Sequence, residues 1–339
     1  MAAHPAARTF TIHYLKTIGI VNNQPIGRGF ANPCDLVVGR DGRIFVLNRG
    51  GGGLSRVGIC NLDEDYLGEF GSYGDADGQF KLPTSIALDS QERVYVADEY
   101  HHRISIFEPS GKFLAKWGVL GTAPGELNGP SGIAFDGQDH MYVVDQHNHR
   151  VQKFTADGQY LAHWGEFGQR EGQFNMPWGI CIGPDGNVYV ADWRNDRIQK
   201  FSPEGRFLAS FGGPGQGDGQ FHRPSAVAVD WEGYIYVADW GNQRVQVLDP
   251  GGRFVVKLRG QATLSKWAEE FFLANPDEKR ERDKANLIPQ LPPHLRTPYH
   301  ESSQIEPYFW GPVSVDLDLQ GRLYVTETNR HRIQVYQRI

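Results

Sequence analysis

The sequence predicts an all-β fold, a six-bladed β-propeller, on the basis of three observations. The 339 residues include 41 glycines, 20 prolines, 8 tryptophans, 14 tyrosines and 19 phenylalanines, a composition typical of short strands joined by turns. A motif built around proline recurs six times, which indicates a repeat architecture. The N-terminal segment also has the form of a strand that the last copy lacks.

The repeat is defined by a proline near the start of each copy. These prolines are Pro33, Pro83, Pro130, Pro177, Pro224 and Pro312, spaced 50, 47, 47, 47 and 88 residues apart. An acid or its amide stands fifteen positions after each proline, at Asn48, Asp98, Asp145, Asp192, Asp239 and Glu327. In the last five copies an arginine follows five positions later, at Arg103, Arg150, Arg197, Arg244 and Arg332.

Each copy divides into four strand-like segments. In the fourth copy these are WGICIG, NVYVAD, RIQKF and RFLASFG, and the intervening PDG and SPEG have the residues of hairpin turns. Four antiparallel strands in about 40–50 residues are typical of a propeller blade. Six copies therefore predict six blades in a single domain, residues 1–339.

The two chain ends are expected to close the ring. The last copy stops at RIQVYQRI, its third strand, whereas the N-terminal TFTIHYLKTIG matches the pattern of fourth strands such as GKFLAKWG and GRFLASFG. We expect the N-terminal strand to complete the last blade, because closure removes the exposed edges of an open sheet.

The repeated motifs PxxIA(x)D, VYVAD and NxR(I/V)QKF resemble those of the NHL-repeat family. The resemblance covers nearly the whole chain and implies an NHL-type propeller. It says little about function, since propellers include enzymes, scaffolds and RNA-binding proteins.

Two recurring positions are interpreted as structural. The acid and the arginine five residues later are expected to form an ion pair that fixes the loop between the second and third strands. His102, His149 and His331 share one repeat position, which Asp196 and Gln243 fill in other copies. Equivalent positions on different blades lie too far apart for the zinc–nitrogen distance of about 2.0–2.1 Å around one ion, so no metal site is predicted there.

Departures from the repeat at the channel mouth predict a ligand site. The loops between second and third strands and those entering each first strand lie on one face, around the channel. Arg49 stands in the glycine-rich NRGGGGLSR without a local carboxylate, and tryptophans offer flat apolar area for a ring, a sugar or a cation. The predicted ligand-binding residues are Arg49, Glu99, Tyr100, His147, Trp178, Trp193, Arg194, Trp240 and Trp310. The alternative for the tryptophans is packing between blades.

An insertion at about 260–311 precedes the last blade. Leu264, Trp267, Ala268 and Phe271 have the spacing of an amphipathic helix, and Asn275 followed by proline predicts the start of a second helix. Because the insertion joins a fourth strand to a first strand, we expect a helical lid over the mouth, with a buttress or dimer contact as the alternative.

The sequence thus predicts a protein that binds a small molecule or protein segment at a lidded mouth. The alternative is a lyase or hydrolase using Arg49 with Tyr100 or His147. Peptidyl-hydroxyglycine amidating lyase is similar in having an arginine–glycine pair where Arg49 and Gly50 stand, but its zinc-binding histidines after the blade proline are missing here. That activity is therefore not expected.

Charge and composition narrow the partners and location. The net charge of −6 and pI near 6.1 argue against nucleic acid and anionic lipid. No cofactor is predicted, although Asn48, Glu99, Asn329 and Asp35 leave a channel-bound metal ion as an open alternative. Neither a secretory signal nor an apolar run of about 18 residues is seen, and three separated cysteines favour a reduced, cytoplasmic protein.

Overall fold

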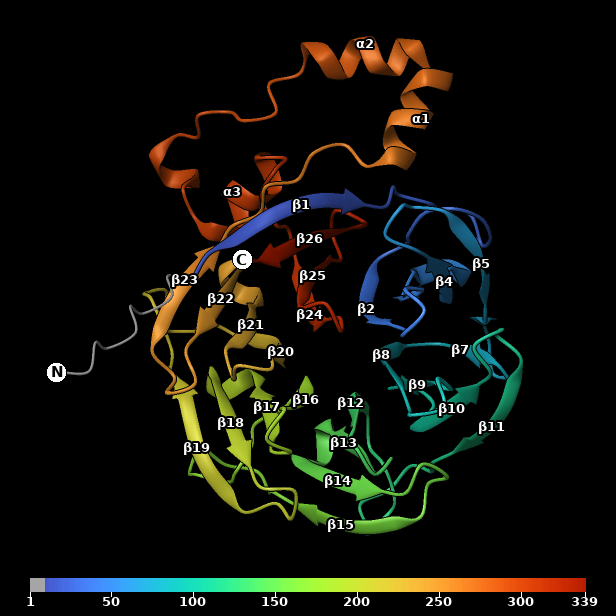
Figure 1. Cartoon of the computed structure of the whole chain (residues 1–339), viewed down its shortest axis with the longest axis vertical. Coiled ribbons are helices and arrows are strands. Elements are labelled where there is room, and N and C mark those ends of the chain that lie inside the picture. The colour runs from blue at the N-terminus through green and yellow to red at the C-terminus, as the bar shows by residue number, and fades with distance from the viewer. Residues whose placement is uncertain (1–9) are drawn as a thin grey trace, which may run out of the picture.

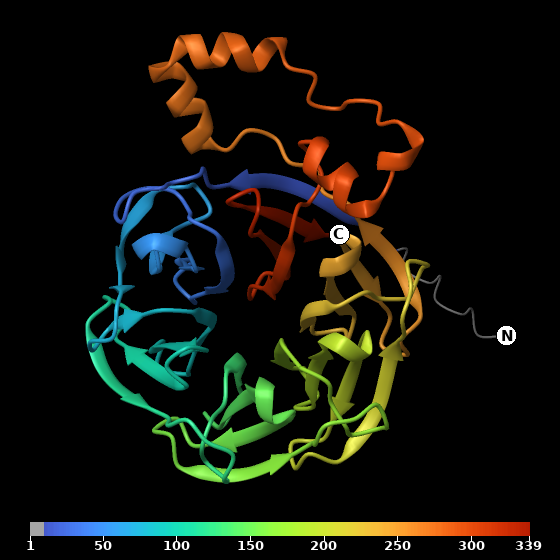
Figure 2. The same ribbon diagram turned by 180° about the vertical axis from the view of Figure 1, so that it is seen from behind.

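The computed structural model describes residues 10–339 and shows six four-stranded antiparallel sheets arranged radially around a central channel (Figure 1). The first strand of each sheet faces the channel and the fourth forms the outer rim, as both views show (Figures 1 and 2). The predicted six-bladed β-propeller is confirmed. No helix within residues 10–339 is long and apolar enough to cross a membrane.

The first three blades follow the N-terminal strand β1 (Ile12–Ile18) in chain order. Blade one consists of β2 (Pro33–Val38), β3 (Ile44–Asn48), β4 (Arg56–Cys60) and β5 (Tyr66–Phe70). Blade two consists of β8 (Pro83–Leu88), β9 (Val94–Asp98), β10 (Arg103–Phe107) and β11 (Phe113–Trp117). Blade three consists of β12 (Pro130–Phe135), β13 (Met141–Asp145), β14 (Arg150–Phe154) and β15 (Tyr160–Trp164). Between blades one and two, β6 (Ser72–Tyr73) pairs in parallel with β7 (Gln79–Phe80).

The remaining blades complete the circle. Blade four consists of β16 (Ile180–Ile182), β17 (Val188–Asp192), β18 (Arg197–Phe201) and β19 (Phe207–Gly212). Blade five consists of β20 (Pro224–Val229), β21 (Ile235–Asp239), β22 (Arg244–Leu248) and β23 (Phe254–Leu258). Blade six consists of β24 (Pro312–Leu317), β25 (Arg322–Glu327), β26 (Arg332–Arg338) and β1. Five first strands begin at the repeat proline, and β16 begins later, at Ile180.

Burial explains why the strands differ in pattern. The second strand VYVAD is buried at every position in β9 and β17, because both faces of each blade pack against neighbouring blades. The fourth strand β19 instead alternates between half-buried and exposed positions, since its outer face meets solvent. The core is therefore divided into hydrophobic clusters between adjacent blades, such as the one that joins Tyr95 and Met141.

The two ends of the chain pair within blade six. β1 runs antiparallel to β26, with Ile12 opposite Arg338 and Ile18 opposite Ile333. Phe10, Ile12 and Tyr14 pack against the cluster between blades five and six. The N-terminal strand thus covers the outer edge of the last blade and leaves no gap in the ring.

The predicted ion pair is present in blades three to six, where the arginine Nε lies 2.7–2.8 Å from the acid. The ion pair is absent from blade two. There Asp98 accepts a hydrogen bond from the His101 ring at 2.7 Å, and Arg103 donates to backbone carbonyls instead. The reason is local. Blades three, four and five have an asparagine three residues after the acid, whereas blade two has His101, which takes the carboxylate oxygen that the arginine would use.

The recurring histidines act as latches between blades. Nδ1 of His102, His149 and His331 accepts the backbone N–H of Gly129, Met176 and Asn32 at 3.0–3.1 Å, each on the next blade. In blades four and five, Asp196 and Gln243 accept the equivalent N–H at 2.7 Å. The position needs a side-chain acceptor, which explains why histidine, aspartate and glutamine all occur there.

These latches predict acid-sensitive stability. Burial lowers the pKa of His102, His149 and His331, because it disfavours the charged imidazolium. The latch itself needs an unprotonated Nδ1 to accept the backbone N–H. Below the ordinary histidine pKa of about 6.5, the unfolded chain binds more protons than the folded one, so stability is full above that pH and falls as pH drops. We expect the free energy of unfolding in urea to fall as the pH drops from 7 to 5.

The matched variant replaces all three histidines with glutamine (H102Q, H149Q, H331Q), the residue used at Gln243. It should fold at pH 7 and show a flatter decline in stability towards pH 5. An unchanged decline would mean that the latches are not the acid-sensitive groups.

The insertion contains α1 (Lys266–Ala274), α2 (Pro276–Lys284), η5 (Pro293–Leu295) and α3 (Pro298–Gln304). It lies beside the outer rim of blade six, not across the channel (Figures 1 and 2). The prediction of a lid over the mouth is therefore wrong. Asn275 precedes α2 as predicted, but its side chain donates to Phe271 and does not cap the helix.

Contacts at both ends hold the insertion at the rim. Trp267 is 1% exposed, packs edge-on against Phe30 and donates its indole N–H to the Glu64 carbonyl. At the other end, Arg330 donates to the carbonyls of Ser302 and Ser303 in α3, where a cation is favoured by the helix dipole. These contacts fit the alternative of a buttress.

Candidate functional site

The channel widens into a pocket of about 710 Å³ on the face that carries the short 3-10 turns η1 (Gly51–Gly53), η2 (Gln146–Asn148), η3 (Trp193–Asn195) and η4 (Trp240–Asn242). We call this the mouth pocket. Its wall includes Cys34, Trp178 and Ser225, which also line the inner channel. No insertion residue lines it among the described residues, so the pocket opens directly to solvent.

Five predicted residues line the mouth pocket, namely Arg49, Tyr100, Trp178, Trp193 and Trp240. Three more lie next to it: Glu99, His147 and Arg194. Trp310 lies elsewhere, because its ring packs against Tyr299 of α3 and beneath the Arg330 guanidinium. Its predicted place in the site is therefore wrong.

The repeat itself positions the tryptophans. Trp193 and Trp240 each follow the buried acid that ends a second strand and begin the turns η3 and η4. Trp178 follows a blade proline. Its backbone N–H donates to the Ala191 carbonyl at 2.8 Å, and β16 begins only at Ile180. The Trp178 and Trp193 ring centroids lie 6.3 Å apart, so two flat apolar surfaces meet on blade four.

A chain of polar side chains, Arg49, Glu99 and His147, crosses the opposite side of the mouth. Arg49 has no carboxylate in its own loop, as predicted, but Glu99 of the next blade lies 2.8 Å from its guanidinium. The other Glu99 oxygen lies 3.6 Å from Nε2 of His147 on blade three. The His147 ring rests on Gly129, where a Cβ would come within 2.4 Å of it. Arg49 is thus neutralised by a partner fifty residues away.

Sequence reasoning missed several wall residues. Tyr73 and Lys81 line the pocket, and Lys81 pairs with Asp75 at 2.6 Å while its ammonium lies 4.6 Å from the Tyr100 ring centroid. Arg223 was also missed, although its guanidinium lies 5.0 Å from the Trp193 ring centroid. Its position directly before a blade proline was the signal available, since that position enters a first strand at the mouth.

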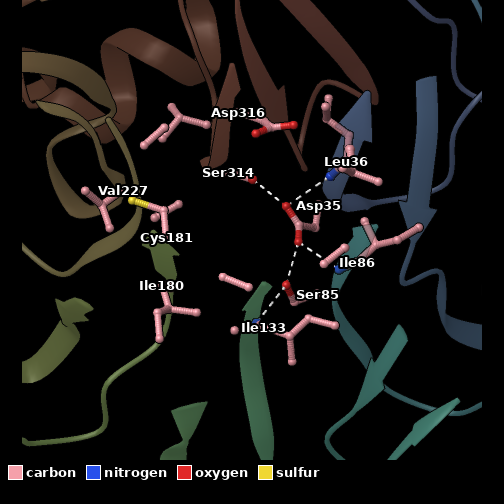
Figure 3. Close-up of a pocket in the computed structure, with 18 of the residues that line it drawn as sticks. Asp35, Leu36, Ser85, Ile86, Ile133, Ile180, Cys181, Val227, Ser314 and Asp316 are labelled. Atoms are coloured by element: carbon pink, nitrogen blue, oxygen red, sulfur yellow. Dashed lines mark hydrogen bonds between the residues drawn. The ribbon is translucent and has the colours of Figure 1, made fainter. Parts of the chain in front are cut away.

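Below the mouth, the inner channel is a cavity of about 200 Å³ lined mainly by apolar side chains, with Asp35 and Asp316 among them (Figure 3). Asp35 accepts hydrogen bonds from Ser314 at 2.6 Å, Ser85 at 2.8 Å and the Ile86 N–H at 2.9 Å. It therefore joins blades six, one and two. Asp316 faces the same cavity, and burial, followed by the negative charge of Asp35, raises its pKa to about 7.

The four residues named for a channel metal lie apart. Asn48 is fully buried and its amide bonds the backbone of Ala31 and Val46. Glu99 holds Arg49, Asn329 lines the mouth pocket, and Asp35 lies in the inner channel. In residues 10–339, no three His, Cys, Asp or Glu side chains are grouped so that they could hold a metal ion.

The NHL repeat family matches residues 80–107, 127–154, 174–201, 221–248 and 309–336. The chain is an NHL-repeat β-propeller protein. The five matched repeats correspond to blades two to six, and blade one, with its glycine-rich loop, completes the ring.

Curated relatives match this NHL-repeat protein over a small part of their length. The chain is 37% identical to NHL repeat-containing protein 3 of Homo sapiens over 81 residues, which is 23% of each chain. It is 40% identical over 47 residues to Protein brain tumor of Drosophila melanogaster, 14% of this chain and 4% of that protein. The matches span less than a quarter of the relatives.

Solved structures share the fold. A streptogramin B lyase has a TM-score of 0.57 at 10% identity, covering 99% of this chain and 100% of that chain. An auxiliary nutrient binding protein from Bacteroides thetaiotaomicron has a TM-score of 0.63 at 11% identity, covering 99% and 79%. At such identities the likeness extends to the fold alone.

Proposed function

We propose that this NHL-repeat propeller binds a small ligand in the mouth pocket. The observation that supports this most is the wall, in which three tryptophans from blades four and five surround a concavity of about 710 Å³. Ligand pockets commonly measure about 300–1,000 Å³ and combine apolar walls with a few polar groups. Blades one and two supply the polar groups Arg49 and Lys81.

A protein segment is the second occupant of the same site that the geometry allows. The insertion lies at the rim and leaves the mouth open, so a loop or chain end could enter without moving it. The pocket shares Cys34, Trp178 and Ser225 with the inner channel, so the two cavities adjoin. A small molecule uses these adjoining cavities better, and we favour it for this reason.

The enzyme alternative has weaker support. A lyase or hydrolase would use Arg49 towards a substrate anion, yet that guanidinium is held by Glu99 at 2.8 Å. Tyr100 is 54% exposed and lies under Lys81, and among the described residues no hydrogen bond joins it to Arg49 or His147. The lyase among the fold neighbours supports the architecture and no reaction.

A neutral flat probe tests the proposed pocket. We expect 2-naphthamide to bind the full chain in isothermal titration calorimetry, and Trp178→Ala or Trp240→Ala to weaken this binding about tenfold each, because central aromatic anchors dominate such sites.

Trp231 supplies the matched control. It is 73% exposed in the turn between β20 and β21, at the other end of the blade from the mouth. Trp231→Ala should leave the affinity unchanged. Equal affinity in all three variants and the wild type would contradict binding at the mouth.

A further inference from the structure

Two arginines at the edge of the mouth pocket, Arg194 and Arg223, have no acidic partner among residues 10–339. The guanidinium carbons of Arg194 and Arg223 lie 5.5 and 5.0 Å from the centroid of the Trp193 ring. Both residues are exposed. Within residues 10–339, neither guanidinium makes a hydrogen bond or an ion pair. The tryptophan that lines the pocket is therefore flanked by two unneutralised positive charges.

This arrangement differs from the other cations near the pocket. Arg49 is paired with Glu99, and Lys81 with Asp75. Asp196 lies between the two arginines in the sequence, and its Oδ1 accepts the backbone N–H of Arg223 at 2.7 Å as a latch between blades four and five. The same oxygen lies 3.8 Å from Nδ1 of His222. That carboxylate is engaged with backbone and lies beyond ion-pair distance of both guanidinium groups.

We propose that the mouth pocket takes an anionic ligand: a carboxylate or phosphate group binds Arg194 and Arg223, and an attached flat ring packs on Trp193 and Trp178. The proposal rests on the proposed function, because it assigns the chemical class of the ligand to the same pocket. Guanidinium groups recognise both anions through paired N–H donors.

The geometry also disfavours a cationic ligand. Tryptophan walls can hold cations through their ring faces, but Trp193 already has two guanidinium groups within 5.5 Å of its centroid. A cationic ligand on this ring would meet both charges. An anion would instead relieve the repulsion between Arg194 and Arg223, so the ring and the charge of the ligand would be recognised together.

Four probes with one ring separate the contributions in isothermal titration calorimetry of the full chain: 2-naphthoate, 2-naphthyl phosphate, 2-naphthamide and 2-naphthylmethylammonium. We expect the better anion to bind at least about fivefold tighter than the amide, and the ammonium to bind weakest. Tighter binding of the phosphate identifies phosphate esters as the class, and tighter binding of the naphthoate identifies carboxylates.

The double variant R194Q/R223Q should bring the anions to the affinity of the amide and leave amide binding unchanged. Arg206→Gln is the matched control, because Arg206 is exposed and lies in the turn between β18 and β19, at the opposite end of the blade. It should retain the preference for anions.

The outcomes separate the two proposals. Equal binding of anions and amide to the wild type, or tighter binding of the ammonium, overturns the anion site and leaves the pocket standing. Loss of the preference in Arg206→Gln also overturns the anion site, since the effect would then be one of net charge. Absence of binding by all four probes overturns both proposals.

Discussion

A chain that begins at Gly19, and so lacks β1, should lose cooperative unfolding and associate through its open edge. Without β1, the backbone donors and acceptors of β26 are unpaired on one side. The cluster between blades five and six also loses Phe10, Ile12 and Tyr14. Full burial of an apolar side chain of this size is worth about 1.5–3 kcal/mol, and these three are partly buried. Together they therefore contribute a smaller but substantial share of a typical stability of about 5–15 kcal/mol.

Circular dichroism melting and size-exclusion chromatography measure this effect, and a rearranged chain provides the control. The Ile339 N–H donates to the Thr11 carbonyl at 3.0 Å, so the end of β26 lies beside the start of β1. Adding Asn-Gly and residues 10–19 after Ile339 to the truncated chain would restore the strand as a hairpin. We expect this permuted chain to melt cooperatively. A truncated chain that melts like the full one would contradict the role of β1.

Replacement of Asp145 by alanine is expected to lower the free energy of unfolding by about 3–5 kcal/mol, because it leaves a buried arginine without its counter-charge. Asp145 is fully buried and accepts from Arg150 at 2.7 Å, from Asn148 at 2.8 Å and from the Asn128 N–H at 2.6 Å. It thus joins the mouth loop of blade three to the strand entry. Urea denaturation at pH 7 measures the change.

An exposed ion pair is the matched control. Asp218 pairs with Lys257 at 2.7 Å, but both side chains are almost half exposed, so Asp218→Ala should change stability by less than about 1 kcal/mol. The double variant D145A/R150M should recover part of the loss, because it removes the unpaired charge as well. A loss below 1 kcal/mol in Asp145→Ala would show that the pair does not fix the loop.

The repeat made much of the fold predictable. Strand and turn residues recur at fixed offsets from each proline, so the strands assigned in one copy predict those of the other five. Two tryptophans of the mouth pocket were predictable for the same reason: Trp193 and Trp240 occupy the position after the recurring acid. Arg49 and Thr328 fill that position in two other blades and also line the pocket.

The errors concern contacts that the repeat does not specify. The insertion was expected over the mouth because of where the chain leaves blade five, yet burial of Trp267 against Phe30 holds it at the rim. Blade two lacks the ion pair because His101 competes for Asp98. Trp310 was expected at the mouth as part of the predicted lid, but its ring packs against Tyr299 of α3 instead.

For this protein, the amino-acid sequence by itself determined the six sheets, their order and the face on which their loops gather. These features depend on residues that are close together in the sequence and recur in each copy. The tertiary structure decided which side chains meet across blades. It pairs Arg49 with Glu99 of the next blade, and it brings Arg223 of blade five to Trp193 beside Arg194. It also decided where the insertion lies. The distances between side chains and their burial in the folded protein decide such contacts. The local sequence pattern predicts neither quantity.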